Sequence, residues 1–205
     1  MNMNGRIEIS QRKTIFQRLI FRIDELQLRH ELYDGSMGEQ VTRLVLERGD
    51  SVAVLPHDPA AGIVLLCEQF RAPTIASGPG WLAEIPAGIL EEGETSENCA
   101  RRETFEETGH EVDALTWIAT VYPSPGGSSE RIHVFYGSIT LRPDVPETAG
   151  VEEEGEDIRI LRVSVDDAVA RLWAGEIQDA KTVIALQWLE LARYRAEARG
   201  ALASG

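Results

Sequence analysis

Residues 95–109 form the segment that most limits the folds open to this chain. Thr95 is a typical N-cap residue, and Gly109 stands where a helix often ends in a left-handed turn. The pattern between them predicts a helix over Ser96–Thr108. On either side of this helix, up to about residue 165, the chain reads mainly as strands.

Short apolar runs before and after this helix predict a central sheet. The expected strands are Val52–Leu55, Ile63–Phe70, Trp81–Ile85, Leu115–Tyr122, Ile132–Ile139 and Ile158–Val165. Two further helices, Asp166–Trp173 and Ala180–Ala198, are expected at the end of the chain. This order of strands, helix, strands and helices favours an α/β sandwich over a doubly wound sheet.

The first fifty residues read as extended chain. Alternating leucines lead into Asp34–Gly35, which is a signal for a hairpin turn. A segment of this length buries little surface alone, so it must pack on the rest of the chain or on a second copy. We therefore expect an N-terminal β extension over residues 1–50 and one main domain over residues 51–205.

Composition limits the compartment and the partners. No apolar run reaches the roughly 18 residues of a membrane span, and Met1–Arg12 lacks the apolar stretch of a signal peptide. We therefore expect a cytoplasmic protein that binds no membrane. The net charge of −14 disfavours nucleic acid, and a phosphate-bearing ligand would need cations as intermediaries. Cys67 and Cys99 are expected to pack as small apolar groups.

Three glutamates of the expected helix predict a metal site. With about 3.6 residues per turn, Glu103, Glu106 and Glu107 share one side of the helix. No lysine lies among them, whereas Arg102 can pair with Glu106 and leave the other two carboxylates free. Hard oxygen ligands of this kind are typical of Mg²⁺ sites. A solvated acidic face is the alternative reading.

Residues 88–110, GILEEGETSENCARRETFEETGH, resemble the Nudix box, G-x5-E-x7-R-E-U-x-E-E-x-G-U, where U is apolar. Every charged and glycine position of the pattern matches. Thr104 and His110 depart from it at the two U positions. Because these positions pack the helix on the sheet, the departures concern local packing more than metal binding, and His110 is given no catalytic role.

The resemblance extends to the ADP-ribose pyrophosphatase branch of Nudix hydrolases over most of the chain. The segments that carry it are Glu47–Gly49, Glu68–Arg71, Ser124–Arg131, Glu153–Ile158 and Val183–Leu189. It implies an α/β/α sandwich with a mixed central sheet and an N-terminal antiparallel strand extension. It further implies Mg²⁺-dependent hydrolysis of ADP-ribose to AMP and ribose 5-phosphate. A homodimer that exchanges its N-terminal strands, which also contact the substrate, is implied as well.

The metal ligands implied by the resemblance are the carboxylates of Glu103 and Glu107 and the carbonyl of Ala87 or Gly88. Glu106 is a further ligand or an orienting neighbour, and Mn²⁺ is a possible substitute for Mg²⁺. A general base is still needed, because a carboxylate bound to metal accepts protons poorly.

In the family the base comes from an acidic loop after the box. Here that loop is residues 150–157, where Glu154 matches the position of the base best and Glu156 second. A solvated acidic loop is the alternative. Arg48, Arg71, Gly88 and Glu130 are the candidates for substrate contacts, since arginine suits bidentate or stacking interactions. A surface ion pair is the competing reading for each arginine.

Two other functions remain open from the sequence. The same chemistry could act on another nucleotide sugar, such as GDP-mannose or ADP-glucose, and Gly175–Thr182 is similar to the GDP-mannose branch. A noncatalytic module that senses ADP-ribose is the alternative from a different class, although such modules typically lose glutamates of the box.

Overall fold

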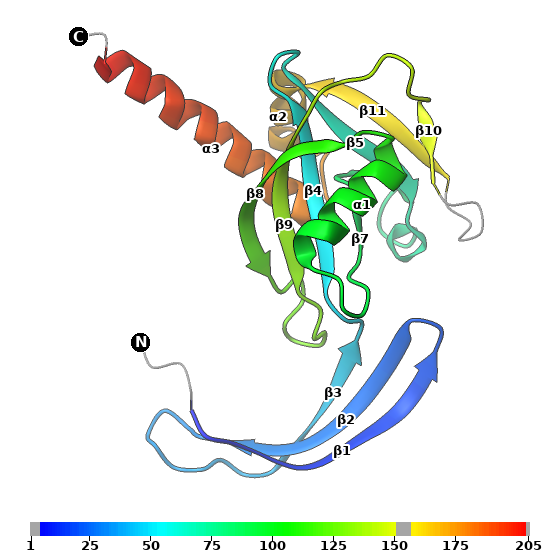
Figure 1. Cartoon of the computed structure of the whole chain (residues 1–205). Helices are drawn as coiled ribbons and strands as arrows, with labels where there is room; N and C mark the ends of the chain where they lie inside the picture. Colours follow the sequence, from blue (N-terminus) through cyan, green and yellow to red (C-terminus); the bar gives the residue numbers. More distant parts are fainter. Residues whose placement is uncertain (1–4, 151–156, 204–205) are drawn as a thin grey trace. The chain divides into compact units, whose positions relative to one another are not determined.

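The structure is a computed structural model that describes residues 5–150 and 157–203 (Figure 1). The chain divides into two compact units. The N-terminal unit comprises Met1–Asp50 together with Tyr122–Arg131, and the main unit comprises Ser51–Val121 together with Ile132–Gly205. Among the described residues, no helix combines the length and the apolar character that crossing a membrane requires.

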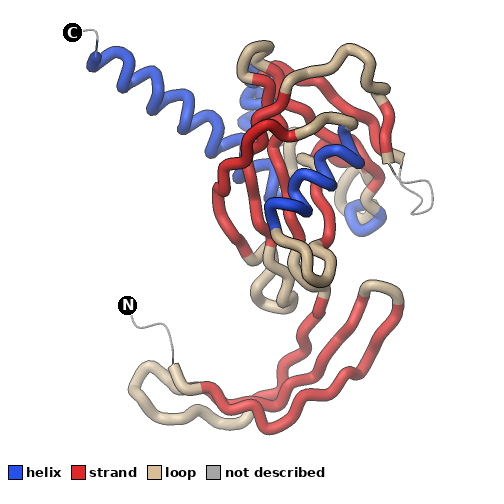
Figure 2. Tube along the Cα trace, viewed as in Figure 1, coloured by secondary structure: helices blue, strands red, loops and turns tan. Residues whose placement is uncertain are grey.

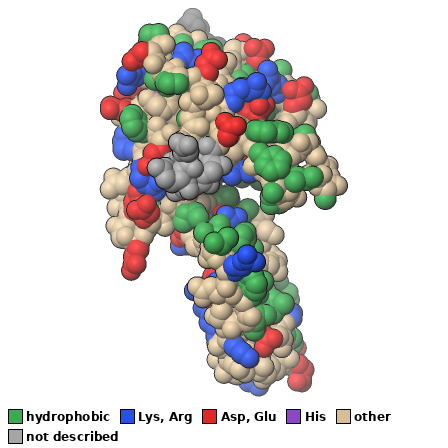
Figure 3. Space-filling model, turned by 90° about the vertical axis from the view of Figure 1, so that its right-hand side faces the viewer, with side chains coloured by type: hydrophobic (Ala, Val, Ile, Leu, Met, Phe, Trp, Pro, Cys, Tyr) green, Lys and Arg blue, Asp and Glu red, His purple; other side chains and the backbone are tan. Residues whose placement is uncertain are grey.

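The N-terminal unit is an antiparallel sheet of three strands in sequence order. They are β1 (Ile7–Arg18), β2 (Phe21–His30) and β3 (Val41–Glu47). Every residue of β1 is exposed in this single chain, and Figure 3 shows hydrophobic side chains on the surface of this unit. Its most buried charged residue is Asp24, which accepts hydrogen bonds from Arg12 (2.7 Å) and Thr14 (2.8 Å). Polar pairs of this kind hold the sheet where a hydrophobic core is small.

The main unit is built on a mixed sheet in the order β10-β11-β5-β4-β9-β8. Strands β4 and β9 are parallel, whereas the other neighbours are antiparallel, and β6 and β7 add to β5 and β4. The bounds are β4 (Ser51–Asp58), β5 (Ile63–Phe70), β6 (Trp81–Glu84), β7 (Ala87–Ile89), β8 (Val112–Val121), β9 (Ile132–Ile139), β10 (Thr148–Ala149) and β11 (Ile158–Ser164). A short 3-10 helix covers Ala72–Thr74.

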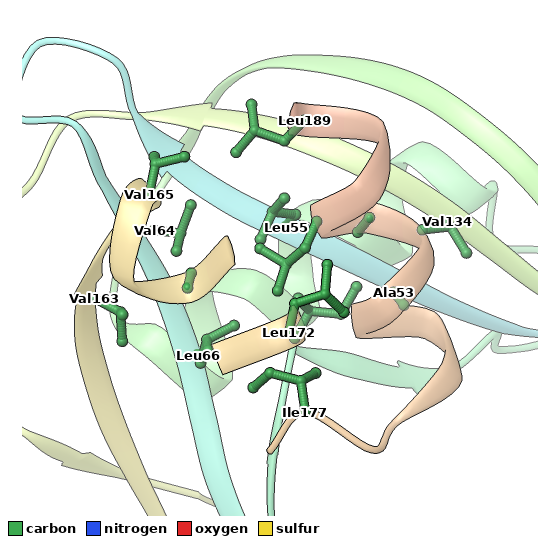
Figure 4. Close-up of a cluster of buried hydrophobic side chains, with 14 of the residues drawn as sticks. Ala53, Leu55, Val64, Leu66, Val134, Val163, Val165, Leu172, Ile177 and Leu189 are labelled. Atoms are coloured by element: carbon green, nitrogen blue, oxygen red, sulfur yellow. The ribbon is translucent and has the colours of Figure 1, made fainter. Parts of the chain in front are cut away.

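Helices cover both faces of this sheet (Figures 1 and 2). The side-chain alternation along β4 assigns the faces, because successive residues of a strand point to opposite sides. Val52 and Val54 pack with α1 (Ser96–Thr108). Ala53 and Leu55 pack with α2 (Val165–Trp173) and α3 (Ala180–Ala203), as Figure 4 shows for Leu55, Leu172 and Leu189. The α/β/α sandwich expected from the sequence is confirmed.

Helix α1 has the predicted bounds because local signals set both of its ends. The Thr95 hydroxyl accepts a hydrogen bond from the backbone N–H of Asn98. Gly109 adopts φ 67°, and its N–H donates to the carbonyl of Phe105 at 2.7 Å. A Cβ at Gly109 would also lie 2.7 Å from Val145, so both conformation and space favour glycine there.

Thr104 and His110 are fully buried, although both are polar. The Thr104 hydroxyl donates to the carbonyl of Ala100 at 2.7 Å. Nδ1 of His110 lies 2.6 Å from the carbonyl oxygen of Thr108, and Nε2 accepts from the N–H of Arg142. The polar side-chain atoms of both residues therefore have partners, so the helix packs on the sheet without an apolar residue at these positions.

Several elements differ from the predicted bounds. Strand β4 extends past Leu55 because its pairing with β9 continues as far as His57. The short strands β7 and β10 were not predicted, and α3 reaches Ala203 instead of Ala198. Cys67 and Cys99 are both buried free thiols, as expected. Burial, with a smaller contribution from nearby glutamates, raises the pKa of Cys99 to about 12.

Candidate active site

The site contains a close contact between strand β7 and helix α1. A Cβ built on Gly88 would lie 1.8 Å from Oε1 of Glu103. A side chain at position 88 would have to displace Glu103, so in this structure the carboxylate of Glu103 rests directly on the backbone of Gly88. The structure thus brings Glu103 to the strand segment that begins with Ala87.

The three box glutamates on α1 differ in exposure. The side chain of Glu103 is 13% exposed and that of Glu106 is 40% exposed. Glu107 is buried, with only 7% of the residue exposed. Its carbonyl oxygen lies 3.9 Å from Sγ of Cys67 on β5, so this turn of the helix lies against the sheet.

Arg102 forms ion pairs with three glutamates of the box. Its Nε and Nη2 each donate to one oxygen of Glu94 at 3.0 Å. Its Nη1 donates to Glu106 at 3.0 Å, as predicted, and also to Glu103 at 2.7 Å. The prediction that Arg102 would leave Glu103 free was therefore wrong. The guanidinium lies between the two carboxylates, so one nitrogen reaches both.

These contacts have electrostatic consequences. The hydrogen bond from Arg102 is the main reason that the pKa of Glu94 falls to about 2, and it raises the pKa of Arg102 above its ordinary value. Arg102 is one cation among three glutamates, and Glu107 lies on the same helix. This part of α1 therefore keeps an excess of negative charge.

The donors present fit a hard divalent cation in their chemistry. They are carboxylates of Glu103, Glu106 and Glu107 and the backbone oxygens near the Gly88 contact, all of them oxygen ligands that Mg²⁺ prefers. Within residues 5–150 and 157–203, no three acidic, histidine or cysteine side chains already converge as a metal cluster. Arg102 holds two of the expected ligands where a cation would compete for them.

Arg71, at the end of β5, is paired and partly buried. Its Nε and Nη2 donate to the two oxygens of Glu84 at 3.1 and 3.0 Å, and Lys181 donates to Glu84 at 2.7 Å. Burial alone would lower the pKa of Arg71, but the bonds and charge of Glu84 outweigh it and raise the pKa. Sequence reasoning missed Glu84 and Lys181. The signal that could have indicated Glu84 was the presence of this acidic residue within the apolar run Trp81–Ile85.

Arg48 and Glu130 lie together in the N-terminal unit. Nη1 of Arg48 is 4.0 Å from Oε2 of Glu130, and the guanidinium lies over the ring of Phe21, 5.7 Å from its centroid. Nε of Arg48 is buried and has no hydrogen-bond partner in the described part of the chain. Arg131 and Asp50 form a further ion pair in this unit.

Glu154 and Glu156, the predicted base and its alternative, lie outside the described residues. The strands on both sides of them are described. β10 and β11 pair antiparallel, with Ala149 opposite Ile158.

Comparisons with known proteins identify the family. The model of the NUDIX domain matches residues 47–193. An ADP-ribose pyrophosphatase of Escherichia coli (strain K12) is 40% identical over 189 residues, which cover 90% of this chain and 88% of that protein. The ADP-ribose pyrophosphatase of Haemophilus influenzae is 37% identical over 190 residues, covering 90% and 86%.

Two further comparisons bear on substrate and fold. A GDP-mannose pyrophosphatase of Yersinia enterocolitica is 36% identical over 160 residues, covering 77% of this chain and 82% of that protein. A crystal structure of an ADP compounds hydrolase superposes with a TM-score of 0.66 at 19% identity, covering 95% and 96%, and shows the same fold. The box, the sandwich and these similarities together establish that the chain belongs to the NUDIX family.

Proposed function

We propose that this NUDIX protein hydrolyses ADP-ribose to AMP and ribose 5-phosphate. The observation that carries the choice of substrate is the 40% identity, over 90% of the chain, to an ADP-ribose pyrophosphatase. The similarity to a GDP-mannose pyrophosphatase is lower and covers less of the chain, so GDP-mannose is the second candidate. ADP-glucose and a noncatalytic ADP-ribose sensor are the remaining alternatives.

Glu103, Glu106 and Glu107, with the backbone carbonyl of Ala87, would hold Mg²⁺ or Mn²⁺. A divalent cation bound there neutralises diphosphate oxygens and acidifies a coordinated water. The chain contributes the placement of the ligands. Gly88 lets the Glu103 carboxylate rest on β7, and Arg102 orients Glu106 from the same helix.

Glu154 is the proposed general base, and Glu156 is the alternative. If Glu154 takes the proton of the attacking water, Glu154→Gln abolishes turnover while calorimetry still detects Mg²⁺ binding. Glu156→Gln then retains measurable turnover. Loss of Mg²⁺ binding in Glu154→Gln would move this residue into the ligand set.

Arg71, Arg48, Gly88 and Glu130 are the proposed substrate contacts. Arg71 keeps one edge of its guanidinium outside its pair with Glu84, and Arg48 lies over an aromatic ring, an arrangement that could extend to a nucleotide base. Both are features expected of arginines that bind a nucleoside diphosphate.

We also propose a homodimer in which residues 1–50 exchange between subunits and contribute to the substrate site. Support comes from the large exposed hydrophobic residues of the N-terminal sheet, which a single chain leaves uncovered. They are Ile7, Ile9, Ile15, Phe16, Phe21 and Leu44. Gel filtration tests this proposal, and a fully active monomer would overturn it. The cytoplasmic location stays a prediction.

A panel of nucleotide sugars tests the function directly. ADP-ribose, ADP-glucose and GDP-mannose are incubated with the protein in ¹⁸O-labelled water, with Mg²⁺ and with EDTA in parallel. The expected result is the highest kcat/KM for ADP-ribose, with no turnover in EDTA. A higher value for GDP-mannose would replace the proposed substrate, and no turnover of any compound would favour the sensor.

A further inference from the structure

A second charged cluster, here called the Glu84 cluster, lies in the main unit and consists of Arg71, Glu84, Asp179 and Lys181. Its central carboxylate is almost completely buried, since the side chain of Glu84 is 6% exposed. The side chain of Lys181 is 11% exposed and that of Asp179 is 16% exposed. Two positive and two negative side chains thus form a network that is nearly enclosed except at Arg71, whose side chain is 37% exposed.

This cluster lies next to the acidic face of α1. Glu84 stands opposite Cys67 in the pairing of β6 with β5. Cys67 in turn contacts the backbone of Glu107, and the charge of Glu107 contributes to the raised pKa of Arg71. The Glu84 cluster and the proposed metal ligands are therefore neighbours across one strand.

Glu84 fixes the plane of the Arg71 guanidinium. Both carboxylate oxygens accept from Arg71, one from Nε and the other from Nη2. This bidentate arrangement leaves little rotational freedom. Nη1 donates no hydrogen bond within the described part of the chain, so the opposite edge of the guanidinium remains available to a ligand.

The start of α3 holds Glu84 from the other side. Nζ of Lys181 donates to Glu84 at 2.7 Å and to Asp179 at 2.8 Å. Asp179 also caps the helix, since it accepts from the backbone N–H of Thr182. The Thr182 hydroxyl accepts from the N–H of Ile85 at 2.8 Å. One helix terminus thus anchors two consecutive residues of the chain that leads to Gly88.

Stability alone explains such a network poorly. A buried ion pair often contributes no more than well-packed apolar residues would, because desolvation opposes the attraction. The residues at the start of α3 also belong to Gly175–Thr182, a segment that the metal site does not use. A role in orienting Arg71 accounts for the full geometry.

We propose that Glu84 is a positioning residue that holds Arg71 toward the diphosphate of the substrate, with Lys181 and Asp179 holding Glu84. This inference rests on the proposed function. Glu84 acts only through Arg71, so it restricts the guanidinium before the substrate arrives and lowers the entropy that binding must remove.

A double-mutant cycle tests this dependence. Steady-state kinetics at saturating Mg²⁺ compare the wild type, Glu84→Gln, Arg71→Ala and the double variant on the best substrate of the panel. Glu84→Gln is expected to raise KM about tenfold with kcat nearly unchanged, since it loosens a charge-assisted hydrogen bond. In the Arg71→Ala background the same change should add no further loss. Losses that multiply in the double variant would overturn the proposal.

Two further variants distinguish an effect on the orientation of Arg71 from an effect on folding. Glu84→Asp keeps the charge and is expected to recover part of the wild-type KM. Asp166→Asn is the control, because it breaks an exposed pair between α3 and α2, Arg193 with Asp166 at 2.8 Å, and should leave KM unchanged. Circular dichroism melts verify folding of each variant.

If Glu84→Gln does not fold, Lys181→Gln replaces it in the cycle. The same additivity criterion then applies, because Lys181 also acts through Glu84. No turnover by the wild-type protein on any nucleotide sugar would refute the proposed function. An active wild type with an additive cycle would refute only the positioning role.

Discussion

The Arg102 cluster, which consists of Arg102 and its three glutamate partners, and the Glu84 cluster differ in their balance of charge. In the first, one arginine forms ion pairs with the three carboxylates of Glu94, Glu103 and Glu106. In the second, the carboxylate of Glu84 accepts from both Arg71 and Lys181. The first cluster keeps a surplus of negative charge, whereas Asp179 balances the second.

Burial makes this difference important. The Glu106 side chain is 40% exposed, but those of Glu94 and Glu103 are only 14% and 13% exposed, and the balanced Glu84 side chain is 6% exposed. An unbalanced charge is costly in the interior, so the largely buried box glutamates need a further cation, whereas the Glu84 cluster is balanced by its own side chains. Charge surplus therefore marks where a cation is needed, and charge balance marks where geometry is held.

The largest expected effect is on catalysis in the Arg102 cluster. Glu103→Gln removes a negative charge from the proposed metal site and should lower kcat by orders of magnitude. Glu97→Gln, at an exposed position of the same helix, should change kcat little. Kinetics with ADP-ribose and Mg²⁺ measure both, and equal effects would mean that the surplus charge of the box has no special role.

The next effect is on stability in the Glu84 cluster. Lys181→Met removes one cation from the buried network and leaves two carboxylates facing Arg71 alone. The free energy of unfolding should fall by about 3 kcal/mol, measured by urea titration. Arg142→Gln, which breaks an exposed pair with Asp144, should change the free energy of unfolding little, because water screens that pair. A similar loss in both variants would show that burial does not distinguish these pairs.

A smaller loss of stability is expected from Arg102→Gln, because the Arg102 side chain is 28% exposed whereas that of Lys181 is 11% exposed. Without this cation the box glutamates repel one another, and the free energy of unfolding should fall by about 1–2 kcal/mol in EDTA. Added Mg²⁺ should recover a larger share of stability in this variant than in the wild type. The same recovery in Lys181→Met would contradict the distinction between the two clusters.

The smallest expected effect concerns acid stability. The pKa of Glu94 is lowered from 4.5 to about 2, so its interaction with Arg102 is complete above about pH 4.5 and is lost as pH falls toward 2. Glu94→Gln should therefore be less stable than the wild type at neutral pH and lose less stability over this acid range. Thermal melts between pH 2 and 7 measure this, with Glu97→Gln retaining the wild-type profile.

Local signals explain which parts of the fold could be predicted. Helix α1 and strands β5 and β9 have the predicted bounds, because caps or continuous apolar runs define them. Strand β4 continues through Pro56, His57 and Asp58, where pairing with β9 and β5, and not the residue pattern, decides the structure. The three residues of β7 form a strand only because β4 lies beside them.

The residues of the site likewise divide into those that local spacing predicts and those that meet only in the folded protein. Spacing within one helix placed Glu103, Glu106 and Glu107 on α1, since neighbouring turns fix their relative positions. Glu84 and Lys181 are 97 residues apart in the sequence and meet only after β6 and α3 have packed. Nothing local to either residue indicates that contact, although each carries a charge in a mostly apolar setting.

The contact between Gly88 and Glu103 has a consequence for how this strand tolerates change. The carboxylate is met by main-chain atoms, which every amino acid shares, so the side chains of β7 do not determine this interaction. Substitutions at the exposed Ile89 can therefore accumulate without disturbing it. At position 88 even one methyl group would displace the Glu103 carboxylate from this place, so the contact requires that residue 88 carry no side chain.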